Sequence, residues 1–506
     1  MKRPAFATLL VLAIGFGACQ LLPERYAVNA PLGHLLLARG REAPQLGTPG
    51  SRIQAADGAR VTLFAGDLAN PRFLRFTPTG DLLVSLPRSG QIVLLEADAD
   101  GDAQSDGRVE LLSGLNRPHG LDLYDGWLYV AETDAVGRIR FDPASRRTRG
   151  SFERVVTGLP GGGNHWTRSL RFGPEGRMYL SIGSSCNACE ESDPRRATLM
   201  RFRPDGSGEE IYATGLRNAV GFDWRPGTGE LFATDNGRDL LGDDTPPCEL
   251  NRVVAGGFYG WPYAHGDNQP DPDLGAGQTA AIRDALAPAH SFRAHNAPLG
   301  IAFVRGESAP AHLRGAALVA LHGSWNRTRK DGYKVVSLHP HPDGSFEERD
   351  FLVGFLEDED VIGRPVDVAE GPDGAFYVSD DYAGAIYRVS HDTAKSLARA
   401  GVPAAAGDRE QPGGPAAGAR EPSEQERKRS QLRGQQLYIE LDCGRCHEPG
   451  RAVPGVMPLP LVELGRRYGI DSLAAYLAAP RPPMPLVELG SVERRDLAAF
   501  LLATFP

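Results

Sequence analysis

Short apolar strands separated by turns recur along most of this chain. A glycine followed by a half-apolar strand that ends in a small residue occurs six times, starting at Gly80, Gly126, Gly176, Gly229, Gly315 and Gly374. Each copy follows another apolar stretch that ends in a turn, and a third strand such as 137–141 or 385–389 usually comes next. A repeat of about fifty residues has the size of a propeller blade. The pattern predicts an all-β six-bladed β-propeller rather than an open sandwich, with 60–65 as the strand that closes the ring.

The pattern changes after the last repeat, so we place the propeller at residues 55–392. Residues 393–430 are Ala, Gly, Pro and charged residues with little to bury, which predicts a flexible linker. Residues 431–506 return to a helical pattern, with a short helix that Asp471 caps and a terminal helix from Ser491 to Leu502. The sequence therefore predicts a second, small all-α domain.

The N-terminus predicts export. Residues 1–18 combine a basic start, an apolar run at 9–16 and two small residues immediately before Cys19, which is typical of a cleaved signal peptide. The cysteine resembles that of a bacterial lipobox, so Cys19 is expected to be lipidated and residues 19–54 to form a tether. The alternative is a plain secretory cut. With lipidation the protein is a membrane-anchored lipoprotein on the periplasmic side, held by acyl chains alone.

Composition excludes several functions. The chain has 506 residues, 41% of them apolar, which is too long for one small core and too apolar for a disordered protein. A net charge of −9 provides no basic footprint for nucleic acid. Beyond the signal peptide, no stretch of eighteen apolar residues is free of charges or turn residues, which argues against an integral membrane bundle.

The helical C-terminal domain contains a haem c attachment pattern. Cys443 and Cys446 have the spacing that forms thioethers to the haem vinyls, and His447 presents an imidazole to the iron. Met484 is expected to be the sixth ligand, because its segment resembles the methionine loop of small class I cytochromes c. Met457 is the alternative, close to His447 and more suited to packing. A redox thiol pair is the other interpretation, but the domain lacks the βαβ context of that motif.

Basic and imidazole side chains precede the predicted inner strands, whose leading loops converge on a propeller's central channel. Several arginine and histidine side chains directed at one funnel would suit a polyanion and proton transfer. The candidates are Arg72, His119, Asn164, His165, Arg217, Asn218, His295, Arg364 and the run His322–Arg327.

The motifs that carry these residues resemble the PQQ-dependent soluble glucose dehydrogenase family, and most closely its L-sorbosone dehydrogenase-like branch. The resemblance covers about residues 55–390 and is most specific at 165–262. The motifs are Gly-Asn-His at 163–165, the strand pair at 170–183, Thr-Gly-Leu-Arg-Asn at 214–218, Asp-Asn-Gly-Arg at 235–238, Gly-Gly-Phe-Tyr-Gly-Trp-Pro at 256–262 and His-Gly-Ser-Trp-Asn-Arg at 322–327.

The resemblance implies roles for several residues. His165 matches the general base, and Asn164 stands where the family has an aspartate that orients this base. Arg217 and Asn218 match the pair that contacts the quinone oxygens of PQQ, and Arg327 matches an arginine that pairs a PQQ carboxylate. The asparagine would stabilise an imidazolium less well than a carboxylate does.

The substrate mouth and the calcium site follow from the same resemblance. His119 stands where the family has a glutamine at the mouth, and the resemblance implies that Arg293 replaces a cofactor-binding lysine. Calcium would rest on the main-chain oxygens of Gly237 and Arg238. Asp243 and Asp244 are either solvated loop acids or indirect support for the ion.

Together the two domains predict a fused dehydrogenase and electron carrier. The resemblance implies oxidation of an aldose or a sorbosone-like aldehyde with PQQ and calcium, followed by one-electron transfers to haem c and then to a downstream redox carrier or respiratory chain. One alternative is a calcium-dependent lactonase-like propeller, which would need carboxylate metal ligands in the channel. The other is a non-catalytic binding propeller joined to a cytochrome.

The remaining cysteines are Cys186, Cys189 and Cys248. In an oxidising compartment three thiols form at most one disulfide and leave one spare. The loops that carry them follow the second strands of adjacent blades, so Cys248 is a candidate to bridge to either member of the pair. We expect a structural disulfide here rather than a metal or redox site.

Overall fold

The computed structural model describes residues 24–29, 43, 44, 46, 51–306 and 308–391, and towards the C-terminus 470–478, 491–505 and separate positions between 430 and 489. Contacts divide the chain into two units, Met1–Ala404 and Ala405–Pro506. The predicted signal peptide, Cys19 and nearly all of the predicted linker lie outside the described residues. Among the described residues, no helix is long and apolar enough to span a membrane.

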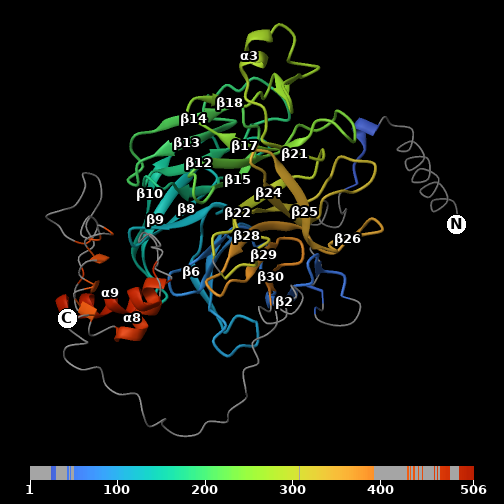
Figure 1. The fold of residues 1–506 in the computed structure, drawn as a ribbon. Coiled ribbons are helices and arrows are strands. Elements are labelled where there is room, and N and C mark those ends of the chain that lie inside the picture. The colour runs from blue at the N-terminus through green and yellow to red at the C-terminus, as the bar shows by residue number, and fades with distance from the viewer. Residues whose placement is uncertain are drawn as a thin grey trace. The chain divides into compact units, whose positions relative to one another are not determined.

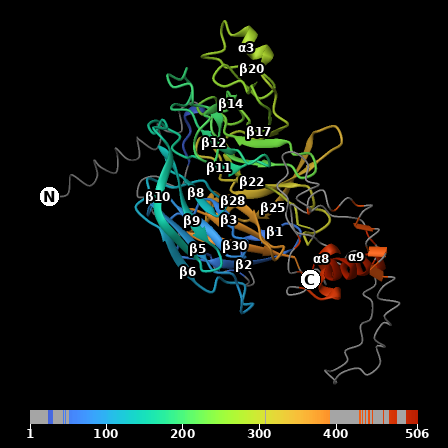
Figure 2. The same cartoon turned by 90° about the vertical axis from the view of Figure 1, so that its left-hand side faces the viewer.

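Six antiparallel sheets of four strands make up the first unit (Figures 1 and 2). Blade one consists of β3 (Leu74–Phe76), β4 (Leu82–Leu86), β5 (Gln91–Leu95) and β6 (Arg108–Leu112). Blade two consists of β7 (Leu121–Tyr124), β8 (Trp127–Ala131), β9 (Ala135–Asp142) and β10 (Arg147–Thr157). Blades three and four consist of β11 (Leu170–Phe172), β12 (Met178–Ile182), β13 (Thr198–Phe202), β14 (Glu210–Thr214), β15 (Ala219–Trp224), β16 (Leu231–Asp235), β17 (Cys248–Val253) and β21 (His290–Phe292). Blade five consists of β22 (Pro298–Phe303), β23 (Ala317–Leu321), β24 (Lys334–Pro340) and β25 (Phe346–Val353). Blade six consists of β28 (Pro365–Glu370), β29 (Phe376–Asp380), β30 (Ala385–Ser390) and β2 (Arg60–Ala65).

Short elements extend these blades. Strand β1 (Gln54–Ala55) joins blade five and β18 (Gly257–Phe258) joins blade three. The remaining pieces are the 3₁₀ helix η1 (Glu24–Tyr26), the pairs β19 (Ala264–His265) with β20 (Gln269–Pro270) and β26 (Leu356–Glu357) with β27 (Asp360–Val361), and helix α3 (Thr279–Asp284). The excursion that carries α3 projects from the sheets in both views (Figures 1 and 2).

The glycine repeat marks the turn before the second strand of every blade, as predicted. All six repeat glycines have a positive φ, for example 94° at Gly80 and 77° at Gly374. This conformation costs glycine little because it has no Cβ. Each following apolar run forms a strand, β4, β8, β12, β16, β23 and β29. The six-bladed propeller is confirmed.

The ring closes through strand β2, also as predicted. Arg60 pairs with Ser390 and Val61 with Val389, so an N-terminal strand completes the sheet of the sixth blade. The last blade therefore combines strands from both ends of the propeller sequence. Antiparallel strand pairing closes the ring.

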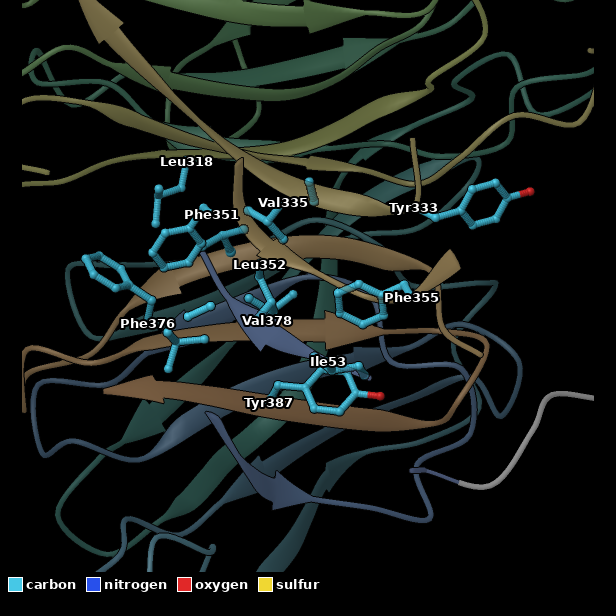
Figure 3. Close-up of a cluster of buried hydrophobic side chains, with 14 of the residues drawn as sticks. Ile53, Leu318, Tyr333, Val335, Phe351, Leu352, Phe355, Phe376, Val378 and Tyr387 are labelled. Carbon is cyan, nitrogen blue, oxygen red and sulfur yellow. The ribbon is translucent and has the colours of Figure 1, made fainter. Parts of the chain in front are cut away.

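Apolar side chains fill the space between neighbouring blades. Figure 3 shows one such cluster, where residues of blades five and six interdigitate. Burying a side chain of this size contributes about 1.5–3 kcal/mol relative to leaving it in water. The labelled members with less than 3% exposure are Ile53, Leu318, Tyr333, Val335, Phe351, Leu352, Phe355, Phe376, Val378 and Tyr387.

Charged residues of alternating sign connect the inner strands of the blades. We call them the charge ring: in blade order, they are Arg75, Asp122, Arg171, Asp223, Arg305 and Asp367. Arg75 Nε lies 2.7 Å from Asp122 Oδ1, and Arg171 Nη1 lies 2.8 Å from Asp223 Oδ1. From the opposite side, Arg305 Nη1 lies 2.8 Å from Asp223 Oδ2. Such charges are stable inside a protein only when they are paired.

The aspartates of the charge ring also accept backbone hydrogen bonds from the next blade. Phe172 N donates to Asp122 (2.8 Å), Phe303 N to Asp223 (2.8 Å) and Leu74 N to Asp367 (2.9 Å). Glu370 of blade six accepts the backbone N–H groups of Arg305 and Gly306 from blade five, at 2.7 and 2.8 Å. Each of the six junctions between neighbouring blades is therefore bridged by a carboxylate.

The disulfide joins Cys186 to Cys189, so the predicted candidate bridge from Cys248 to this pair is wrong. Cys248 begins β17 and is 1% exposed in an apolar cluster with Phe232 and Phe292. Burial there raises the pKa of its thiol to about 11. Cys248 therefore acts as a small apolar core residue.

The C-terminal unit contains helices α8 (Ile470–Ala478) and α9 (Ser491–Thr504), close to the two predicted helices. Asp471 lies inside α8 rather than capping it. Leu473 and Leu477 of α8 share a buried cluster with Leu497 and Leu501 of α9. Cys446 and Met484 lie outside the described residues. Helical structure in this unit is confirmed, whereas a cytochrome c domain stays a prediction.

Replacing Asp223 by asparagine tests the charge ring. The Asp223→Asn variant keeps the shape of the side chain but leaves Arg171 and Arg305 without their carboxylate. We expect the free energy of unfolding to fall by about 3 kcal/mol, measured by urea denaturation with circular dichroism. The exposed control Asp267→Asn should change it by less than about 0.5 kcal/mol. Equal stability of the two variants would contradict a structural role for the ring.

Candidate functional site

Two cavities lie in the propeller, and the charge ring contributes to the lining of one of them. The larger, about 720 Å³, is lined by the ends of the inner strands and the turns that follow them. The second, about 580 Å³, is lined by the loops that precede the inner strands, where the sequence predicts the site. Its lining residues are Asn70, Arg72, Pro87, Arg88, Arg117, Asn164, His165, Trp166, Thr167, Asn218, Val220, Leu299, His322 and Asp381. We call this second space the loop-side cavity.

His165 has the geometry of a neutral base. Its Nδ1 lies 2.8 Å from Ser184 O and 2.9 Å from Ser184 Oγ. A carbonyl oxygen only accepts hydrogen bonds, so Nδ1 carries the proton and Nε2 keeps its lone pair. Burial, and then the nearby Arg217 guanidinium, lower the pKa of His165 to about 3. At neutral pH this imidazole is therefore unprotonated and able to accept a proton.

Ser184, and not Asn164, orients this imidazole. Asn164 is exposed, and its backbone N–H donates to Ser185 O at 2.8 Å. The resemblance implies that the Asn164 side chain orients the base, but Ser184 makes the contacts that orient it. Sequence comparison directs attention to the residue beside the base, whereas the actual partner is nineteen positions away.

The loop closed by the Cys186–Cys189 disulfide links His165 to Arg217. Ser184 Oγ donates to Cys186 O (2.8 Å), and Ser184 N donates to Arg217 O (2.7 Å). Within the loop, Asn187 O and Oδ1 each accept a bond from the Arg217 guanidinium at 2.9 Å. One short loop therefore holds both the base and the arginine.

Arg217 does not line the loop-side cavity, although Asn218 does. The Arg217 side chain is 4% exposed, and its Nη1 donates to Asn236 O (3.1 Å) and Gly237 O (2.9 Å). Its Nη2 lies 3.3 Å from Asp239 Oδ2. Because protein groups occupy the guanidinium, direct contact with the quinone oxygens would require it to exchange partners.

The positions predicted for calcium lie in this same network. Gly237 O, one of the two predicted main-chain ligands, already accepts the Arg217 bond. The Arg238 guanidinium is buried against Asp271, with Nη1 2.6 Å from Oδ2, and against Asp273. A carbonyl oxygen has a second lone pair, so Gly237 O could still bind an ion.

Three ionisable side chains centred on Asp381 form another side of the cavity. Arg72 Nη1 lies 2.7 Å from Asp381 Oδ2, and His322 Nε2 lies 2.9 Å from Asp381 Oδ1. Burial raises the pKa of Asp381, but His322 and Arg72 lower it more strongly, so its carboxylate is ionised. Arg364 lies next to these side chains, with Nε 3.2 Å from His322 O.

The cavity has a cationic rim that the sequence interpretation missed. Arg88 and Arg117 are exposed at the loop-side cavity, and the Arg117 guanidinium lies 4.0 Å from the centre of the Trp166 ring. With Arg72 they make three arginines against the single carboxylate of Asp381. The lining therefore favours an anionic ligand, and Trp166 beside His165 provides an aromatic face.

His119 does not line the loop-side cavity, so its role at the substrate mouth stays a prediction. It is 0% exposed, with Nε2 3.4 Å from Arg72 Nη2 and its ring 5.5 Å from that of Trp166. Burial, with Arg72 as the next cause, lowers its pKa well below the usual value. His119 is therefore a neutral packing residue beneath the cavity.

The remaining predicted residues also lie outside the cavity lining. Arg293 is exposed and pairs with Asp331 at 3.1 Å, and Arg327 is buried with Nη2 3.3 Å from Asp244. The Arg327 guanidinium also donates to the backbone oxygen of Asp243. His295 Nε2 lies 2.8 Å from Gly242 O. The contacts of Arg327 and His295 hold the loop at 239–244, which also carries the Asp239 that contacts Arg217.

Comparison with known proteins identifies the family. A profile described as Glucose / Sorbosone dehydrogenase matches residues 126–388, which is just over half of the chain. The chain belongs to this dehydrogenase family. It is an oxidoreductase family whose members similar to this chain include PQQ-dependent sugar dehydrogenases.

Three relatives illustrate the similarity. An uncharacterized protein of Borreliella burgdorferi is 31% identical over 293 residues, which cover 55% of this chain and 76% of the relative. The pyrroloquinoline quinone-dependent sugar dehydrogenase of Hypocrea jecorina is 28% identical over 329 residues, covering 53% and 73%. The pyrroloquinoline quinone-dependent pyranose dehydrogenase of Coprinopsis cinerea is 26% identical over 350 residues, covering 58% of this chain and 45% of its own length.

Solved structures share the fold of this dehydrogenase. The holo form of the pyranose dehydrogenase PQQ domain from Coprinopsis cinerea has a TM-score of 0.59 at 22% identity and covers 69% of this chain and 100% of its own. The calcium structure of a Trichoderma reesei carbohydrate-active enzyme of family AA12 has the same score and identity and covers 69% and 99%. These similarities support the six-bladed propeller.

The depressed pKa of His165 predicts a pH dependence of stability. As the pH falls from 6.5 towards 3, the unfolded histidine takes up a proton that the folded one does not, so this residue makes the protein less stable in acid. The His165→Gln variant should therefore lose less stability over this range, by about 1 kcal/mol per pH unit. Unfolding midpoints measured between pH 7 and 4 test this, with the exposed His341→Gln as control. Parallel curves for His165→Gln and the wild type would contradict it.

Proposed function

We propose that this chain oxidises an aldose sugar or a sorbosone-like aldehyde with bound PQQ, and passes the electrons to a haem c in its C-terminal unit. The observation that carries the proposal is the neutral His165 imidazole beside three arginines in one cavity of a Glucose / Sorbosone dehydrogenase family member. A proton acceptor and an anion-binding wall are what oxidation of a hydroxyl by an anionic quinone needs.

His165 would act on the substrate hydroxyl. Its Nε2 is the basic nitrogen, because the Nδ1 proton is held by Ser184 O. PQQ, when bound, supplies an ortho-quinone that accepts a hydride from the carbon. His165 would take the hydroxyl proton as that hydride leaves, and Ser184 would keep the ring in one tautomer throughout.

The arginines would hold the anionic cofactor. Arg72 is fixed by Asp381, so its position is set before a ligand enters. Arg88 and Arg117 are exposed at the rim, where their guanidinium groups would pair with carboxylates, and Arg117 would have to leave the Trp166 ring to do so. The Trp166 face and the apolar side chains of Val220 and Leu299 would contact the flat ring system.

Calcium is part of the proposal. Gly237 O and Arg238 O alone cannot satisfy an ion that takes six to eight oxygens. Further oxygen atoms would have to complete the set, and their negative charge would offset repulsion from the Arg217 guanidinium that shares Gly237 O.

The haem is proposed from the motif and its local geometry. His447 N donates to Cys443 O at 3.2 Å, so one helical turn separates the first thiol from the imidazole. This places the two on the same side of the backbone, as covalent haem attachment and ligation require. Cys446 would form the second thioether and Met484 would be the sixth ligand. A tether to the dehydrogenase would give the haem a high effective concentration as electron acceptor.

Export and lipidation complete the proposal. Haem c attachment takes place outside the cytoplasm, which agrees with the signal sequence and with a lipid-anchored Cys19 on the periplasmic side. The electrons would then pass to a downstream redox carrier or respiratory chain.

Removing the proposed base tests the dehydrogenase. After reconstitution with PQQ and Ca²⁺, the wild type should reduce an artificial dye with at least one member of a panel of aldoses and sorbosone-like aldehydes. The His165→Ala variant should lose about 10²–10⁴-fold in kcat because no other group takes the hydroxyl proton. PQQ binding, measured by equilibrium dialysis, should be retained.

The exposed control His341→Ala should retain full activity. If the whole panel leaves the dye oxidised with PQQ bound, the dehydrogenase proposal fails. If His165→Ala keeps its activity, the role of the base is refuted.

Replacing the motif residues tests the haem. Cys443→Ala or Cys446→Ala should abolish covalent haem, detected by haem staining after denaturing electrophoresis, while dye reduction by the propeller continues. Met484→Ala should change the absorption and lower the reduction potential of the haem, because a thioether ligand raises it. The matched control Met457→Ala should leave both unchanged. Wild-type chain without covalent haem, from a host that attaches haem c, would refute the proposal.

A further inference from the structure

Three metal-binding side chains meet where the ring closes, outside the loop-side cavity. Asp57 lies in the turn before β2, His391 directly follows β30, and His312 lies in the loop between β22 and β23 of blade five. His312 Nε2 is 3.1 Å and His391 Nε2 is 2.6 Å from Asp57 Oδ2. All three donor atoms lie within 4.8 Å of one another. We call these residues the seam cluster.

The surrounding contacts orient the donor atoms. The backbone N–H of Ala59 donates to Asp57 Oδ1 at 3.0 Å, which leaves Oδ2 towards the histidines. The His391 ring packs against the edge of Phe376, with centroids 6.3 Å apart. Its Nδ1 is buried, so Nε2 is the nitrogen available to an external ligand. The two imidazoles stand nearly perpendicular, 6.1 Å apart.

Two imidazole nitrogens and one carboxylate oxygen are a donor set that Zn²⁺ prefers. Zinc bonds to such atoms are about 2.0–2.2 Å long, which puts neighbouring ligands of a tetrahedral ion about 3.3 Å apart. Each histidine nitrogen would need to move by less than about 1 Å from its present distance to Asp57 Oδ2 to reach this spacing, and the two nitrogens already lie within 4.8 Å of each other. The His312 side chain is 50% exposed, so an ion can enter from solvent, which would also supply the fourth ligand.

We propose that Asp57, His312 and His391 bind a divalent transition-metal ion, Zn²⁺ in preference to Ca²⁺ or Mg²⁺, at the seam of the propeller. The nitrogen donors exclude the hard ions, which take oxygen ligands. This site is separate from the proposed dehydrogenase chemistry and does not depend on it.

The ion would stabilise the closure of the propeller ring. Asp57 belongs to the segment that leads into the closing strand β2, and His391 directly follows β30, the strand with which β2 pairs. His312 belongs to blade five, so the ion would also connect this blade to the two paired strands. These residues come together only in the folded chain, so metal binding would stabilise the closed propeller and not the unfolded protein.

The experiment uses the full chain, freed of any affinity tag and stripped with a chelator. Zn²⁺ binding is measured by calorimetric titration in Ca²⁺-containing buffer, and the thermal midpoint is measured with and without Zn²⁺. The test variants are Asp57→Asn and His312→Ala. The matched control is His290→Ala, which removes a histidine that also pairs with a carboxylate, Glu348 at 3.0 Å, but belongs to no group of three such ligands within the described part of the chain.

The wild type and His290→Ala should each bind one more Zn²⁺ ion than either test variant. Zn²⁺ should also raise the thermal midpoint of these two proteins more than that of the test variants. His312→Cys should restore binding, because a thiolate replaces the imidazole as a zinc ligand. Circular dichroism without metal confirms that the variants fold. The proposal is overturned if the Zn²⁺ stoichiometry and the shift of the thermal midpoint are the same in the wild type, Asp57→Asn and His312→Ala. It is also overturned if His290→Ala lowers both quantities as much as the two test variants do.

Discussion

The fit between neighbouring inner strands is the constraint on which the rest of the propeller depends. The charge ring and Glu370 bridge every junction between blades with a carboxylate. The strands also approach so closely that a Cβ on Gly221 would lie 2.1 Å from Leu299 O. Buried charges tolerate little displacement because each lost partner leaves an unpaired ion. The ring therefore fixes the inner strands relative to one another, and these strands follow the loops that line the cavity.

The chemistry of the cavity follows from that fixed frame. His165 is held by the main chain of blade three, and burial keeps it neutral. A base of this kind needs no carboxylate to raise its proton affinity, since its task is only to accept a proton when charge develops on the substrate. The disulfide loop that carries Asn187 also holds Arg217, so the base and the arginine share one support.

The two ends of the propeller meet at a different place from the cavity. The N-terminal strand β2 and the C-terminal strand β30 pair at the outer part of the last blade, and the seam cluster lies beside that pair. A metal ion there would strengthen closure without touching the loop-side cavity. The seam cluster shares no residue with the lining of the loop-side cavity, so changes at the two places should have additive effects.

The sequence by itself determined the blade count and the closing strand, because turn glycines and alternating apolar runs act locally and repeat. It also placed His165, Asn218, Arg72 and His322 at the cavity, since loops before inner strands must converge. Only the tertiary structure decided the partners: Ser184 for the base, Asp381 for Arg72, and the pairing that leaves Cys248 alone in the core. Hydrogen bonds and burial between distant segments depend on how the blades pack, which no local pattern records.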